Sequence, residues 1–133
     1  MNFHSLVTAM FVVGGAGHAI AQEMPAREAE QKAAALELVL VDVRQPEEWA
    51  ETGVAPGAVL ITLQDADFLD QLAAATKGDK GVPVAFICRS GKRSGTAAEK
   101  AKAAGYTQVY NVPGGMSMAG GWIDSGLRVE AAR

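Results

Sequence analysis

The sequence predicts a single α/β domain with a mainly parallel sheet. Short apolar runs alternate with stretches of helix-forming residues along the chain, the arrangement typical of helices packed on a parallel sheet. The best-defined runs are apolar at almost every position, as in strands buried on both faces. A chain of 133 residues suits one such domain. It contains no internal repeat or low-complexity tract.

Residues 1–21 have the features of an export signal, and we assign the domain to residues 22–133. The segment has no Lys, Arg, Asp or Glu, and its apolar run Leu6–Val13 is too short to span a bilayer comfortably. Ala19-Ile20-Ala21 matches a signal-peptidase site. We expect cleavage after Ala21 and a periplasmic or secreted protein, or a cytoplasmic one if the leader is not functional. A buried N-terminal helix or strand is the alternative.

The first half of the domain alternates between helices and strands. Helix-forming Ala, Glu, Gln and Lys predict a helix over 25–36, and an apolar run predicts a buried strand over 38–43. A short helix is expected over 46–51, with Pro in its first turn and acids near its positive end. Pro56-Gly57 marks a turn before a second strand at 58–63.

The second half continues the alternation. Apolar spacing predicts a helix over 65–76, and an apolar run predicts a strand over 83–87. An alanine-rich helix is expected over 94–104, followed by a strand at 109–112. The segment around Trp122 is expected to close the domain with a helix or a turn.

Composition excludes several classes of function. The net charge of −3 argues against a nucleic-acid partner. A single cysteine, Cys88, cannot form an intramolecular disulfide. Both histidines, His4 and His18, lie in the first twenty residues, which disfavours Cys-His proteases and Ser-His-Asp hydrolases. The sequence has no metal-ligand cluster, and we expect neither a metal nor an organic cofactor.

The loop that begins at Cys88 carries the strongest chemical signal. It follows a predicted buried strand, and in open α/β sheets ligands bind at the carboxyl ends of strands. Successive backbone N–H groups, a helix N-terminus and three cations would favour the thiolate and hold a small anion. We therefore predict Cys88 to be the catalytic residue. The predicted substrate-binding residues are Arg89, Ser90, Gly91, Lys92, Arg93 and Ser94.

Some residues near this loop allow two interpretations. A buried, inert Cys88 is disfavoured because structural cysteines prefer apolar neighbours. Ser94 could donate to a bound anion, cap the helix, or do both. Asp42 and Arg44 are candidates for supporting the site from the first strand.

Asp42 could stand beside the entrance, but we favour an ion-pair network that joins Arg44 to Glu47 or Glu51. Among the larger side chains, Trp49 and Trp122 are expected to pack. Met116 and Met118 could line the pocket mouth, although a role in the core is favoured.

Four motifs in order resemble the rhodanese family, specifically its single-domain exported sulfurtransferases. The resemblance runs from about residue 28 to residue 130. The motifs are Val41–Trp49, Gly53–Ala58, Cys88–Ser94, and Asn111–Met116 with Trp122 and Gly126-Leu127. It implies a three-layer domain with a five-stranded parallel sheet, and a persulfide on Cys88 cradled by the loop amides. Val54 stands where family members often have His, and the gap from Gly115 to Trp122 is longer than usual.

The resemblance and the cationic loop together predict a sulfurtransferase. Its partners would be a thiosulfate-like anion and a thiol or cyanide acceptor, with no nucleic acid, no membrane after cleavage, and a monomeric state. A phosphatase or arsenate reductase on the same scaffold is one alternative. Phosphatases that resemble rhodanese have five residues between Cys and Arg, but here Arg93 comes one place earlier. A non-enzymatic sulfur carrier or binding module is the other alternative.

Overall fold

The computed structural model describes residues 21–133, which form one five-stranded parallel sheet with helices on both faces. The elements are β1 (Gln22–Glu23), α1 (Ala26–Ala34), β2 (Val39–Asp42), α2 (Pro46–Thr52), β3 (Val59–Leu60), α3 (Phe68–Ala75), β4 (Val84–Ile87), α4 (Lys92–Ala103) and β5 (Val109–Asn111). The strand order is β1-β5-β4-β2-β3. The predicted α/β class and parallel sheet are confirmed. The predicted leader, apart from Ala21, lies outside the described residues.

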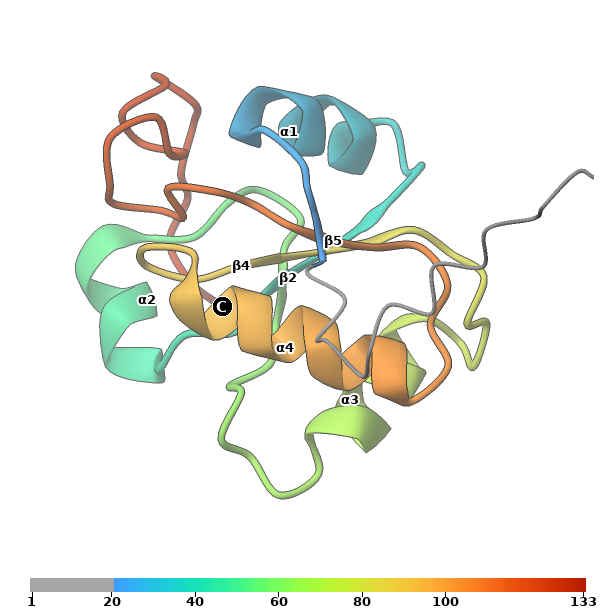
Figure 1. Cartoon of the computed structure of the whole chain (residues 1–133). Coiled ribbons are helices and arrows are strands. Elements are labelled where there is room, and N and C mark those ends of the chain that lie inside the picture. The colour runs from blue at the N-terminus through green and yellow to red at the C-terminus, as the bar shows by residue number, and fades with distance from the viewer. Residues whose placement is uncertain (1–20) are drawn as a thin grey trace, which may run out of the picture.

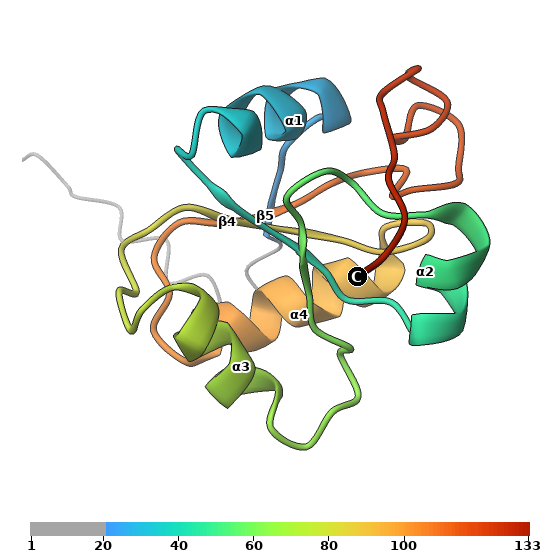
Figure 2. The same cartoon turned by 180° about the vertical axis from the view of Figure 1, so that it is seen from behind.

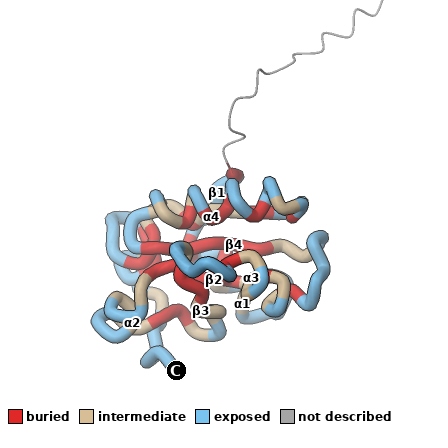
Figure 3. The backbone as a smooth tube through the Cα atoms, turned by 90° about the horizontal axis from the view of Figure 1, so that it is seen from below, coloured by how far each residue is buried: buried red, intermediate tan, exposed pale blue. Residues whose placement is uncertain are grey.

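The sheet separates two apolar layers because successive side chains of a strand point to opposite faces. Val41 and Val43 pack with α3 and α4, whereas Leu40 packs with α1 and the C-terminal segment. Figures 1 and 2 show α1 on one side of the sheet and α3 and α4 on the other. Burial follows this arrangement, since the central strands β2 and β4 are almost wholly buried in Figure 3.

One strand of the sheet was not predicted from its own residues. Gln22 and Glu23 form β1, which pairs in parallel with β5 at the sheet edge. Both residues are exposed and polar, so this two-residue strand has no apolar pattern that could reveal it. Its pairing depends on β5, which is distant in sequence. The other four strands lie within the predicted runs, and each is shorter than predicted.

Helix α4 begins two residues earlier than predicted. Gly91 occupies the N-cap position with φ +103°, a backbone conformation that glycine adopts without steric cost. The helix therefore starts at Lys92, and Ser94 lies in the first turn instead of at the cap. The capping role considered for Ser94 is wrong, because its hydroxyl points toward Cys88 and Asn111.

The segment after β5 closes the domain through turns, as one of the two predicted options allowed. Trp122 is buried, and its indole N–H donates to the carbonyl of Arg128 at 2.9 Å. This contact holds the chain after residue 122 against the face that α1 covers. No helix between residues 21 and 133 is both long and apolar enough to cross a membrane.

Candidate active site

Cys88 lies directly after β4, at the carboxyl end of the central strand pair. Its side chain is fully buried. Sγ accepts hydrogen bonds from the Gly91 amide at 3.1 Å and from the Ser94 hydroxyl at 3.2 Å. Because the loop turns at Gly91 and enters α4 at once, donors of the first helical turn are directed at the sulfur. The arrangement favours a negative charge on Sγ.

Two opposing effects act on the Cys88 thiol. Burial raises its pKa, since it disfavours the charged form. The Ser94 hydroxyl and the amides of Ser94, Gly91 and Ser90 lower it by hydrogen bonding to the thiolate. Together the hydrogen bonds outweigh the burial, and the pKa lies below that of an ordinary cysteine. The sulfur is therefore more readily ionised than a free thiol, as a nucleophile requires.

The segment after β5 holds the base of the loop. The amides of Met116 and Ser117 donate to the carbonyls of Cys88 and Arg89, at 2.8 and 3.1 Å. Gly115, which directly precedes Met116, has φ +51°, and a Cβ there would stand 2.4 Å from the Cys88 carbonyl oxygen. Only glycine permits this close approach of the two backbones. The position of Cys88 thus depends on a glycine distant in sequence.

Asn111 is a site residue that the sequence analysis missed. Its Nδ2 donates to the Gly91 carbonyl at 3.0 Å, and its Oδ1 accepts from the Ser94 hydroxyl at 2.6 Å. It supports the loop and also contacts the hydroxyl that reaches the sulfur. The sequence placed Asn111 near the end of a predicted strand, but only the structure shows that this strand lies next to β4, where the carboxyl ends of parallel strands share one edge.

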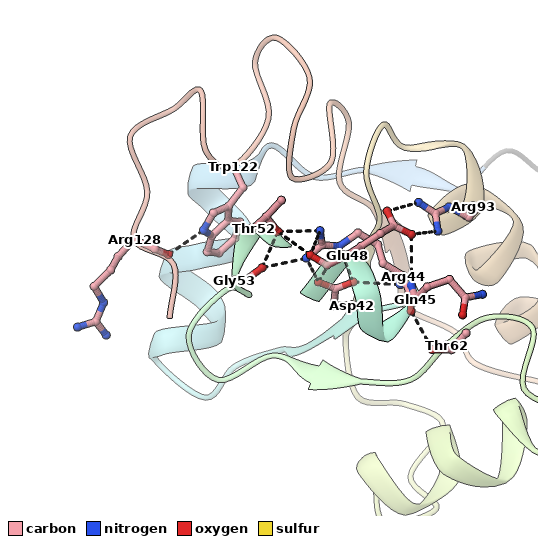
Figure 4. Close-up of polar contacts among 10 residues, drawn as sticks. All are labelled: Asp42, Arg44, Gln45, Glu48, Thr52, Gly53, Thr62, Arg93, Trp122 and Arg128. Carbon is pink, nitrogen blue, oxygen red and sulfur yellow. Dashed lines mark hydrogen bonds and ion pairs between the residues drawn. The ribbon is translucent and has the colours of Figure 1, made fainter. Parts of the chain in front are cut away.

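The three loop cations are placed differently from one another. Arg93 forms a two-pronged ion pair with Glu48 of α2, at 2.6 and 2.8 Å, and each side chain is about a quarter exposed. The pair is visible in Figure 4. The hydrogen bond to Arg93 lowers the pKa of Glu48, and the same bond raises that of Arg93. Arg89 and Lys92 are exposed.

Sequence reasoning did not identify Glu48 as a site residue. Its carboxylate lies beside the cationic loop and pairs with Arg93. Arg89 lines an adjacent pocket of about 370 Å³. The other residues around this pocket are Arg44, Glu48, Glu51, Thr52 and Ser117.

Arg44 and Asp42 form a buried ion pair at the end of β2. Arg44 donates to the two carboxylate oxygens of Asp42 at 2.8 to 3.1 Å, and also to Thr52 and the Gly53 carbonyl. Figure 4 shows the guanidinium enclosed by these acceptors. The expected network with Glu47 or Glu51 is wrong, because the carboxylate two residues before Arg44 is already buried beside it.

The remaining candidates lie in different surroundings. Ser90 is exposed on the loop. Met116 is buried in the core, whereas the Met118 side chain is about half exposed. Between residues 21 and 133 no three His, Cys, Asp or Glu side chains gather as metal ligands would.

The fold and this geometry define a class of protein: a parallel α/β domain that presents a cysteine in an anion-binding loop. Sequence comparison identifies the family. The Rhodanese-like domain family matches residues 25–118, which is more than half of the chain. The chain belongs to the rhodanese-like domain family.

Individual proteins are similar to this chain in sequence or in fold. The thiosulfate:glutathione sulfurtransferase of Saccharomyces cerevisiae is 33% identical over 97 residues, which cover 67% of each protein. A solved structure from M. tuberculosis has 31% identity and a TM-score of 0.71, covering 86% of this chain and 100% of its own. A protein of Rhodopseudomonas palustris described as a possible tyrosine phosphatase has 26% identity and a TM-score of 0.67, covering 83% and 85%.

Proposed function

We propose that the protein is a sulfurtransferase that carries sulfane sulfur as a persulfide on Cys88. One observation carries the proposal: the Cys88 sulfur accepts hydrogen bonds from Gly91 and Ser94 at the entrance to α4. This environment stabilises a thiolate without a histidine base, and none lies in residues 21–133. The similarity to the yeast thiosulfate:glutathione sulfurtransferase supports the same reaction class.

The reaction divides into two displacements. The Cys88 thiolate attacks the outer sulfur of a thiosulfate-like donor, a new S–S bond forms, and the donor S–S bond breaks with its electron pair leaving on sulfite. Cyanide or a thiolate then attacks the outer sulfur of the persulfide. The Cys88 thiolate is thereby regenerated, and thiocyanate or an acceptor persulfide leaves. No external oxidant or reductant is required.

Charges around the loop suit a small anionic donor. Arg89 and Lys92 are exposed beside the sulfur-bearing loop and can attract a sulfonate group. Arg93 contributes less net charge than its position suggests, because Glu48 pairs with it. We assign anion binding to the loop amides with Ser90 and Ser94, assisted by Arg89 and Lys92.

A phosphatase is the second candidate, since the R. palustris relative is described as a possible tyrosine phosphatase. The loop argues against it. Cys88 and Arg93 are separated by four residues, and Ser94 occupies the position of the phosphatase arginine. The Arg93 guanidinium is moreover bonded to Glu48 instead of facing an anion above the sulfur.

Intact-protein mass spectrometry tests the proposal. The purified protein is incubated with thiosulfate, weighed, and then treated with cyanide while thiocyanate is assayed. We expect a gain of one sulfur atom that cyanide removes, and none in Cys88→Ser. Hydrolysis of an aryl phosphate that is lost in Cys88→Ser would favour the phosphatase instead. Failure with thiosulfate, persulfides, thiosulfonates and mercaptopyruvate would favour a binding module.

We also propose that the leader directs export and is removed after Ala21, so that the domain acts in the periplasm or outside the cell. The motive is the small-x-small pattern that ends at Ala21. N-terminal sequencing of the protein from separated bacterial fractions tests this. An exported form that begins at Gln22 supports the proposal, and a full-length cytoplasmic protein overturns it.

A further inference from the structure

We propose that Asn111 is a positioning residue that governs the ionisation of Cys88 by competing for the Ser94 hydroxyl proton. Ser94 Oγ lies 3.2 Å from Cys88 Sγ and 2.6 Å from Asn111 Oδ1. Ser94 is fully buried, as is Cys88. The inference concerns the thiol itself, so it holds whatever molecule the sulfur attacks.

The competition follows from the chemistry of a hydroxyl. Ser94 has one O–H proton, so it can donate to only one of these two atoms at a time. The orientation of the Asn111 amide is fixed by its second contact, because Nδ2 donates to the Gly91 carbonyl at 3.0 Å. Oδ1, which can only accept, is therefore the atom that faces Ser94.

The two contacts define two arrangements of one proton. When Cys88 is a thiol, the Ser94 hydroxyl donates to Asn111, and the S–H group can donate to Ser94 Oγ. When the thiol ionises, its proton passes to solvent. The Ser94 hydroxyl keeps its own proton, rotates, and donates to the thiolate. A persulfide makes Sγ neutral again, and the hydroxyl returns to Asn111.

Asn111 therefore stabilises the uncharged forms of Cys88 relative to the thiolate. When the Asn111 acceptor is removed, the Ser94 hydroxyl can donate only to the sulfur, which should favour ionisation of Cys88. The charged groups around Cys88 are Arg89 and Lys92, which are exposed, and two ion pairs, Arg93 with Glu48 and Asp42 with Arg44. The Asn111 side chain bonds only to Gly91 and Ser94 and to neither pair, so we expect the effect of both pairs on Cys88 to be common to all the variants compared.

A double-mutant cycle separates this role from simple support of the loop. The pKa of Cys88 is measured by thiolate absorbance, which is specific because the chain has one cysteine, with Cys88→Ser as the baseline. We expect Ser94→Ala to raise the pKa by about one unit, and Asn111→Leu to lower it by about half a unit. In the Ser94→Ala background, Asn111→Leu should change it by less than about 0.2 units.

Asn111→Leu removes the hydrogen bond to the Gly91 carbonyl in both backgrounds. The effect of that loss on the Cys88 pKa therefore cancels when the two shifts are subtracted. Equal shifts in the two backgrounds, or no shift in either, would overturn the proposal. Asn111→Asp is the second variant if Asn111→Leu does not fold. This variant retains an acceptor for the Ser94 hydroxyl. It should raise the pKa of Cys88 more when Ser94 is present than in the Ser94→Ala background. Equal rises in the two backgrounds would overturn the proposal. Since the readout needs no sulfur donor, it is independent of the proposed sulfur transfer.

Discussion

The carboxyl ends of β2 and β4 lie side by side in the sheet, with Asp42 aligned to Ile87, yet they use polar groups in opposite ways. At the end of β2, the Arg44 guanidinium and the Asp42 carboxylate satisfy each other in the interior. At the end of β4, an amide and a hydroxyl are directed at Cys88 Sγ. The ion pair at the end of β2 holds the backbone in place, whereas the donors at the end of β4 stabilise negative charge on the Cys88 sulfur.

One ion pair connects the two ends. Glu48 belongs to α2, which follows β2, and it binds Arg93 of the helix that follows β4. Glu48 also accepts from the Gln45 amide at 3.3 Å, which ties it to the start of its own helix. The rigid strand end can therefore position a cation of the reactive loop.

The largest expected effect comes from breaking the buried pair at the β2 end. Arg44→Leu leaves the Asp42 carboxylate buried without its partner and should reduce the free energy of unfolding by about 3–5 kcal/mol. Adding Asp42→Asn removes that buried charge and should recover part of the loss. Urea unfolding of the two variants measures both effects. Equal stability of Arg44→Leu and the parent protein would contradict a supporting role for this pair.

A smaller but site-specific loss is expected when the backbone packing beneath Cys88 is disturbed. Gly115→Ala places a methyl group against the Cys88 and Arg89 carbonyls and should cost about 1–3 kcal/mol, with loss of persulfide formation.

Gly57→Ala is the matched control. It has a similar positive φ of +77° but no atom within 4 Å, so it should cost about 1 kcal/mol and retain activity. Unfolding and thiosulfate labelling are compared for both variants. Retained labelling in Gly115→Ala would show that the loop tolerates displacement.

Breaking the connection between the two ends should have a modest effect on stability. Glu48→Gln loses an ion pair that is about a quarter exposed, a change expected to stay within about 1 kcal/mol. Because Arg93 lowers the pKa of Glu48 in the folded state, the stabilisation is present above the ordinary Glu pKa and lost as pH falls through the lowered value.

The difference in the free energy of unfolding between Glu48→Gln and the parent protein should thus vanish in acid. Urea unfolding at a series of pH values measures this difference. Release of Arg93 should also lower the KM for thiosulfate. An increase in KM would mean that Glu48 holds Arg93 in its productive position.

The smallest expected effect is the pH dependence of Cys88 itself. Its lowered pKa predicts that the rate of reaction with thiosulfate rises with pH and has its midpoint below the pKa of an ordinary thiol. The lowered folded-state pKa also stabilises the fold above the ordinary thiol pKa, and this contribution is lost as pH falls through the lowered value. Stopped-flow rates across pH measure the first effect, and urea unfolding of the protein and of Cys88→Ser measures the second. A midpoint above the pKa of an ordinary thiol would contradict stabilisation of the thiolate by these hydrogen bonds.

The sequence by itself determined the α/β class, four of the five strands and all four helices, because apolar periodicity and helix-forming composition are local signals. It also singled out Cys88 and its loop, since residues 88–94 are contiguous. Glu48 and Asn111 were missed as site residues because they reach the loop from α2 and β5, and no local pattern reports such contacts.

The tertiary structure alone decided which charges are used internally and which remain at the surface. Arg44 pairs with Asp42, two residues before it, instead of Glu47 or Glu51, because both side chains are buried together at the end of β2. Arg93 pairs with Glu48, which is distant in sequence, because adjacent parallel strands bring their carboxyl ends to one sheet edge. The edge strand β1 was decided in the same way, by pairing with β5. Local propensity fixes which segments fold into helices and strands, whereas partners of polar groups depend on the approach of distant elements.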